Sequence, residues 1–231
     1  MDTGERAYEK IINYVEQQVM HGRYKKGDKL PPERELAALL GASRNSVREG
    51  LGILERMGAI SSQQGAGNFI SDNFEKTLIE VMTLMFILEE GTFREISEFR
   101  YALETQALAL AMEHISKKQL VDIEYYMSML EKTPEEDMKA YYDKKIHYTI
   151  TAASGNRFII DNLQALTAVM DVFIKDMRAK ILSDGSNSEG LMAAHRKMVE
   201  ALREKNMEKN MEKGMQALKV HFEYIYEYID G

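Results

Sequence analysis

Prolines are almost absent from this chain: Pro31, Pro32 and Pro134 are the only three among 231 residues. Because proline ends or kinks a helix, the sequence after Pro32 is free to form helices almost throughout. Apolar residues recur at helical spacing in seven segments joined by short connections, namely 75–90, 92–115, 117–132, 135–153, 156–182, 189–205 and 207–229. We therefore expect a mainly α protein whose larger part is an antiparallel all-α bundle of about seven helices.

The first 73 residues follow a different pattern. Three short helical segments are predicted, at 5–20, 32–40 and 44–57, and Ser43 is expected to cap the third. Residues 58–73 then alternate apolar and polar positions around Gly65 and Gly67, which predicts a small β-hairpin. We therefore predict a winged helix-turn-helix domain over residues 1–73 and an all-helical effector-binding and dimerisation domain over 74–231.

The composition excludes several classes of protein. The chain has no cysteine, so disulfides, cysteine-ligated zinc and thiol catalysis are all excluded. No basic segment followed by an apolar run opens the chain, and no apolar stretch approaches the ~20 residues of a membrane helix. We expect a cytoplasmic protein with no membrane partner. Its net charge of −7 is uneven, because residues 1–70 carry about +1 and the remainder about −8.

The strongest local signal is a helix, a glycine turn and a second helix: ERELAALL, GAS and RNSVREGLGILERMG. Such a pair presents its second helix to the major groove of DNA. Arg44, Asn45 and Arg48 lie near the start of that helix, where arginine can pair with guanine and asparagine with adenine. Any one of these residues alone is more often a solvated surface residue than a DNA contact.

The run KKGDKLPPERELAALLGASRNSVREGLGILERMGAISSQQGAGNFI resembles the winged helix of the GntR family of bacterial regulators. The resemblance implies DNA contacts from Arg34, Arg44, Arg48 and Gly65. It also implies contacts that vary with the operator from Ser43, Asn45, Ser46 and Gln64. The sequence departs from the family at Gly50 and Gly52, each of which costs a helix interior ~1 kcal/mol relative to alanine.

Histidines suggest a metal site in the helical part of the chain. Asp143 and His147 are one helical turn apart, and His195 and His221 each lie on an apolar helix face. One carboxylate and three imidazoles suit zinc, nickel, manganese or iron. The residues alone leave open the alternative that each histidine is an ordinary core or surface group.

The C-terminal part resembles the FCD domain of the FadR-like branch of the GntR family, through FRYALETQALALA, DKKIHYTITAASGN and AHRKMVEALREKN. The resemblance implies that Asp143, His147, His195 and His221 bind a divalent transition metal, and it argues against an acyl-thioester effector. Arg100 is predicted either to anchor an effector carboxylate or to form an ion pair with Glu104 or Glu98. Asn156 is predicted to cap a turn between helices.

These features together predict a transcription regulator and not an enzyme. We expect a repressor that binds palindromic operator DNA as a homodimer, with its affinity modulated by a small organic acid bound at the metal. Two alternatives stay open. The bundle could be a ligand-free dimerisation module, or the metal could serve a hydrolase, for which no acid–base residue is evident.

Overall fold

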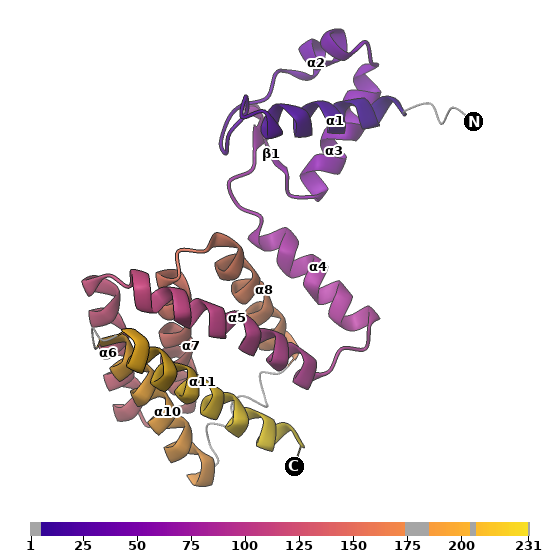
Figure 1. The fold of residues 1–231 in the computed structure, drawn as a ribbon. Coiled ribbons are helices and arrows are strands. Elements are labelled where there is room, and N and C mark those ends of the chain that lie inside the picture. The colour runs from indigo at the N-terminus through magenta and orange to yellow at the C-terminus, as the bar shows by residue number, and fades with distance from the viewer. Residues whose placement is uncertain (1–5, 174–184, 204–206, 231) are drawn as a thin grey trace. The chain divides into compact units, whose positions relative to one another are not determined.

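A computed structural model of the protein describes residues 6–173, 185–203 and 207–230 (Figure 1). The chain divides into two compact units, Met1–Leu78 and Ile79–Gly231. In the described residues, helices predominate and the sheet is a two-stranded hairpin. This confirms the mainly α fold with a winged helix-turn-helix.

The N-terminal unit contains α1 Ala7–Met20, α2 Glu33–Leu40, α3 Arg44–Arg56, β1 Ile60–Gln63 and β2 Gly67–Ile70. Gly41 ends α2 in the left-handed conformation, with a φ of 60°, and so permits the tight turn into α3. Ser43 caps α3 as predicted, since its Oγ accepts a hydrogen bond from the backbone N–H of Ser46 at 3.1 Å.

The core of this unit explains one of the two helix glycines. Apolar side chains from α1 and α3 meet there, including Ile11 and Leu51. A Cβ added at Gly50 would lie 2.8 Å from both the Ile11 Cβ and the Tyr8 carbonyl oxygen. Gly50 therefore allows the two helices to approach closely, and its conformational cost is offset by packing.

The hairpin is antiparallel, with Ile60 opposite Ile70 and Gln63 opposite Gly67. Its turn is closed by a hydrogen bond of 3.0 Å from the Ala66 N–H to the Gln63 carbonyl oxygen. Gly65 and Gly67 have φ values of 75° and 108°, a region that glycine enters at little cost.

The remaining helices are α4 Glu75–Leu88, α5 Phe93–His114, α6 Lys117–Lys132, α7 Glu136–Ala153, α8 Arg157–Phe173, α10 Gly185–Arg203 and α11 Met207–Asp230. Most lie within two residues of the predicted segments. The exception is α10, which begins four residues earlier than expected. Residues 174–182 of the predicted segment 156–182 lie outside the described residues.

Side-chain caps set where several of these helices begin. Thr92 and Glu95 form a reciprocal capping box at α5, and Ser116 forms another with Gln119 at α6. The Asn156 Oδ1 accepts hydrogen bonds from the N–H groups of Phe158 and Ile159, at 3.1 and 3.3 Å, which confirms the predicted cap.

The bundle brings five helices around one interior. α10 contacts α11, α6 and α5, and α5 also contacts α7 and α11. The main apolar cluster of this unit draws its buried side chains from α5, α6, α7, α10 and α11. A group of buried polar side chains lies among them. None of the described helices is long and apolar enough to cross a membrane.

Candidate metal centre and nucleic-acid interface

The four residues predicted to bind metal come together in the C-terminal unit. Asp143 and His147 lie one turn apart on α7, His195 lies on α10, and His221 lies on α11. In that order, these four residues are 5, 5, 1 and 2% exposed. Sequence could not show that three separate helix faces converge, and the packing of α7, α10 and α11 supplies that convergence.

Their donor atoms are close to one another. The Asp143 Oδ1 lies 3.0 Å from the His195 Nε2 and 3.7 Å from the His147 Nε2. The two Nε2 atoms are 3.1 Å apart, and one nitrogen from each of the three imidazoles lies within 4.8 Å of the others. Ligand atoms about 2.0–2.1 Å from one metal ion are separated from each other by roughly 3 Å, which these spacings approach.

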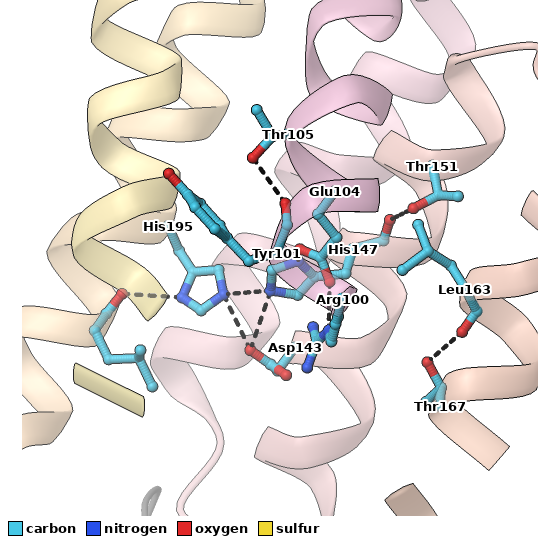
Figure 2. A network of polar contacts seen from close by, with 11 residues as sticks. Arg100, Tyr101, Glu104, Thr105, Asp143, His147, Thr151, Leu163, Thr167 and His195 are labelled. Carbon is cyan, nitrogen blue, oxygen red and sulfur yellow. Dashed lines mark hydrogen bonds and ion pairs between the residues drawn. The ribbon is translucent and has the colours of Figure 1, made fainter. Parts of the chain in front are cut away.

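The outer nitrogens of two imidazoles fix how the rings are turned. The His147 Nδ1 is 2.7 Å from the Glu104 Oε2, and the His195 Nδ1 is 3.0 Å from the Leu191 carbonyl oxygen (Figure 2). A carboxylate and a carbonyl only accept hydrogen bonds, so both Nδ1 atoms carry the proton. Both Nε2 atoms then face the same point, and an Nε2 that carries no proton offers its lone pair to a cation there.

Glu104 is the residue of this centre that sequence reasoning missed. It binds His147 on one side and forms an ion pair with Arg100 on the other. Burial opposes its ionisation, but Arg100 and His147 outweigh that effect and lower the pKa of Glu104 to about 2. Glu104 is thus ionised at neutral pH and able to accept from His147. The sequence signal for Glu104 was its i, i+4 spacing from Arg100 on α5. That spacing predicted an ion pair with Arg100 and not a contact with His147.

Arg100 is buried, and its guanidinium lies over the Phe222 ring at 5.6 Å. Of the two predicted roles, the ion pair with Glu104 is present in the structure. Contact with an effector stays a prediction.

His221 provides a test of whether a metal ion fits. Both of its ring nitrogens are buried, and neither has a hydrogen-bond partner among the described residues. Burial, together with His195 and His147, holds its pKa well below the usual range, so the ring is neutral and able to bind metal. An unpaired buried polar group costs about 1–3 kcal/mol, and a bound cation would remove part of this penalty. The donor set therefore fits a divalent transition metal.

A cavity of about 240 Å³ leads to two members of the quartet. Asp143 and His195 contribute to its wall, and the other lining residues are Leu130, Glu131, Lys139, Glu189, Leu191, Met192 and Arg196. A larger cavity of about 580 Å³ lies along α10 and α11, but none of the four metal-site residues lines it. We therefore associate the smaller cavity with the metal centre.

The residues predicted to contact DNA lie at the start of α3, on α2 and at the tip of the hairpin. Arg34, Arg44, Asn45 and Arg48 are exposed, as are Gln64 and Gly65. Arg48 is also within ion-pair distance of Glu33, with its Nε 3.5 Å from the Glu33 Oε2. The Ser43 and Ser46 hydroxyl oxygens are 2.9 Å apart, so the cap occupies both side chains.

Lys29 is a second residue that sequence reasoning missed. It pairs with Phe69 through an isolated β-bridge beside the hairpin, and its Nζ lies 5.8 Å from the centre of the Phe69 ring. This places an exposed cation beside the wing. Its position follows from a bridge between segments 40 residues apart, and no local pattern signals that bridge.

Two family profiles match this chain. Residues 7–70 match the profile of bacterial regulatory proteins of the gntR family, and residues 95–223 match that of the FCD domain. The chain belongs to the GntR family. It is a DNA-binding transcription regulator with an FCD effector domain. Its profiles and relatives are those of regulators and not of enzymes, so the hydrolase alternative is set aside.

Curated relatives resemble it over different lengths. The putative L-lactate dehydrogenase operon regulatory protein of Escherichia coli (strain K12) is 26% identical over 182 residues, which are 76% of this chain and 69% of that protein. The HTH-type transcriptional repressor YtrA of Bacillus subtilis (strain 168) is 42% identical over 95 residues, or 41% of this chain and 72% of that protein.

Among solved structures, Streptococcus agalactiae GntR superposes with a TM-score of 0.64 at 23% identity, over 95% of this chain and 99% of that one. This likeness shows the fold alone.

Proposed function

We propose that this GntR-family protein is a cytoplasmic, homodimeric repressor that binds a palindromic operator. In this proposal, a small organic acid binds beside a divalent metal ion in the C-terminal unit and weakens DNA binding. One observation carries it: three buried imidazoles and a carboxylate converge, and two of the four, Asp143 and His195, line a cavity. Burying these polar side chains in a mainly apolar core lowers stability unless hydrogen bonds or a bound ion satisfy them.

Operator recognition is assigned to the start of α3. Arg44, Asn45 and Arg48 are exposed there, within reach of base edges, and Gln64 and Gly65 at the hairpin tip are suited to contact the backbone. Further DNA contacts are assigned to Arg34, Ser43 and Ser46. One recognition helix reads only a few base pairs, so two copies on a palindrome are needed for specificity.

Asp143, His147, His195 and His221 would hold the metal ion, and Glu104 and the Leu191 carbonyl would keep two of the rings turned toward it. Zinc, nickel, manganese and iron all suit these donors. When bound, the metal supplies positive charge and open coordination positions that attract a carboxylate.

The cavity beside the centre indicates the size and class of the effector. Its volume of about 240 Å³ lies below the ~300–1,000 Å³ of pockets for drug-sized ligands, so it suits a small acid and not an acyl thioester. Lys139 and Arg196 line it as cations, and Glu131 and Glu189 line it as acceptors. This combination fits a small hydroxy acid, whose carboxylate meets the cations and whose hydroxyl donates to a glutamate.

Arg196 is favoured over Arg100 as the protein's own anchor for the effector. The Arg196 Nε lies 2.5 Å from the Glu131 Oε1 at the cavity wall, and the Arg196 side chain is 50% exposed. Arg100 does not line the cavity, and it is held by Glu104. A ligand can therefore reach Arg196 without disrupting the core.

The names of relatives are compatible with a small organic acid as the effector. They differ on whether the regulator represses or activates transcription. One relative is named for an L-lactate dehydrogenase operon, another is named a repressor, and a Glc operon regulator of Escherichia coli (strain K12) is named an activator. We propose repression because the repressor has the highest identity of these three, over 95 residues.

The proposed response is a shift between two arrangements of the DNA-binding heads. An acid bound beside α7 and α10 favours an arrangement whose spacing no longer matches the two half-sites. A coupling of about 1–3 kcal/mol, or 5- to 150-fold in operator affinity, is typical of such systems.

The test measures operator affinity, using a palindrome selected by the protein from random DNA. Metal-loaded protein is titrated with L-lactate, malate and citrate, and at least one is expected to weaken binding by roughly fivefold or more. Protein stripped of metal should show no response. If no small acid changes the affinity of fully loaded protein, the ligand-free dimerisation module becomes the better account.

A pair of matched variants tests the cavity assignment. Arg196 and Arg203 both join α10 to α6, through Glu131 and Glu124 respectively, but only Arg196 lines the cavity. Arg196→Gln should reduce sensitivity to the active acid by roughly tenfold or more while operator affinity without the acid is kept. Arg203→Gln should leave both unchanged. Equal effects from the two variants would contradict the assignment.

A further inference from the structure

The β1–β2 hairpin, the wing of the N-terminal unit, is flanked by a further extended segment, residues 27–30. Two backbone hydrogen bonds of 2.8 Å join this segment to β2, from the Ile70 N–H to the Asp28 carbonyl oxygen and from the Leu30 N–H to the Asn68 carbonyl oxygen. Lys29 lies between these bonds, in an antiparallel bridge with Phe69. Because β1 already pairs with one edge of β2, the segment takes the other edge, and the backbone of Lys29 is held to the wing.

The side chain of Lys29 lies along the wing. Its Nζ is 5.8 Å from the centre of the Phe69 ring. A Cβ added at Gly67 would lie 3.2 Å from the Lys29 Cε and 3.9 Å from the Nζ, so the absence of a side chain at Gly67 leaves room for the lysine. Gly67 is two residues from Gly65 in the hairpin turn. The ammonium group is therefore placed close to the tip of the wing.

The charge of Lys29 has no counter-ion within the protein. The residue is exposed, and no carboxylate forms an ion pair with it in the part of the chain that the structure describes. Contact with the Phe69 ring accounts for the position of the aliphatic stem but does not neutralise the ammonium. An exposed cation held in place beside the hairpin tip suits a phosphate group, which lysine binds as a point charge.

We propose that Lys29 binds a phosphate of the DNA backbone beside the wing. This inference rests on the proposed operator surface and adds to it a contact outside the helix-turn-helix and the hairpin turn. Base edges are assigned to α3, whereas the Lys29 stem lies against β2, so its contact is with the backbone. A phosphate contact positions the protein on DNA but carries no sequence information. Lys29 should therefore strengthen binding to operator and to unrelated DNA by the same factor.

The test measures how the affinity of full-length protein for DNA changes with salt. One duplex carries the selected palindrome, and the other has the same length and an unrelated sequence. Lys29→Gln removes the charge and Lys29→Arg keeps it. Lys10→Gln is the matched control, because Lys10 is also exposed and has no ion pair among the described residues. It lies on α1, which packs through Ile11 against the buried side of α3, away from the exposed arginines. Circular dichroism establishes that each variant is folded.

Each phosphate contact adds about 0.9 to the slope of the logarithm of affinity against the logarithm of salt concentration. Lys29→Gln should lose one such contact. Raising salt from about 50 to 200 mM should then weaken its binding to either duplex roughly 3.5-fold less than it weakens wild-type binding. Lys29→Arg and Lys10→Gln should keep the wild-type slope.

A wild-type slope in Lys29→Gln, or the same reduced slope in Lys10→Gln, would overturn the assignment. A change confined to the palindrome would also overturn it, since a phosphate contact is independent of sequence. In each of these cases, operator binding by the wild type that is lost in Arg44→Gln would leave the proposed operator surface standing. A wild type that binds neither duplex would overturn both.

Discussion

At the scale of single residues, the centre is organised by groups that do not themselves face the converging donor atoms. Glu104 accepts from the His147 Nδ1, and the Leu191 carbonyl accepts from the His195 Nδ1. Each contact fixes which nitrogen carries the proton and leaves Nε2 facing inward. His221 lacks a corresponding contact among the described residues and depends most on whatever the centre binds.

Replacing Glu104 should weaken metal binding without removing a ligand. Glu104→Gln keeps the size of the side chain but removes the charge that stabilises the His147 Nδ1–H, so we expect metal affinity to fall by roughly 10- to 100-fold. Competition with a metal-sensitive dye measures the change. Glu98→Gln is the control, because Glu98 lies on the same helix in an exposed ion pair with Arg94. Unchanged affinity in Glu104→Gln would show that Glu104 does not act through His147.

The side chains that sequence could identify are those with a local signature. Asp143 and His147 share a helix face, and Ser43 and Asn156 occupy cap positions, so periodicity and turn chemistry were enough. Glu104 was different, because its contact with His147 spans 43 residues and depends on how α5 packs against α7. The cavity and its Arg196 also required three helices to be placed together, which no local pattern supplies.

At the scale of elements, α3 shows how one residue type serves two purposes. By helix propensity, Gly50 and Gly52 both lower the intrinsic stability of this helix, and the sequence predicts the same cost for each. The structure separates them. A Cβ at Gly50 would collide with Ile11 and the Tyr8 carbonyl, whereas a Cβ at Gly52 would meet only the Arg56 Nη1, at 3.7 Å.

Alanine at these two positions should therefore have opposite effects on stability. Gly50→Ala forces α1 and α3 apart and is expected to lower the free energy of unfolding by about 1–3 kcal/mol. Gly52→Ala should raise it by up to ~1 kcal/mol, since alanine is the better helix former. Urea unfolding followed by circular dichroism measures both. Equal effects of the same sign would contradict the packing role of Gly50.

The elements themselves were largely predictable, because propensity and packing agree in this chain. Scarce proline and sustained apolar periodicity indicated the helices after the wing, and caps such as Thr92 and Ser116 fixed several of their starts. The start of α10 was missed, since Gly185-Ser186-Asn187-Ser188 reads as a loop by composition.

At the scale of the whole molecule, the sequence separates a DNA-binding unit from a sensing unit. The first has exposed arginines at the start of α3, and the second has a buried quartet beside a cavity. In our proposal these surfaces communicate through a dimer. The account therefore depends on one chemical claim, that the quartet binds a metal ion.

Elemental analysis of untagged protein, with wild type beside His195→Ala, tests that claim most directly. We predict about one transition metal ion per chain in the wild type and its loss in the variant, in which one of the four donors is missing. Circular dichroism on both samples establishes that the variant is folded. A wild type that is purified without metal and does not take up zinc, nickel, manganese or iron would contradict the account.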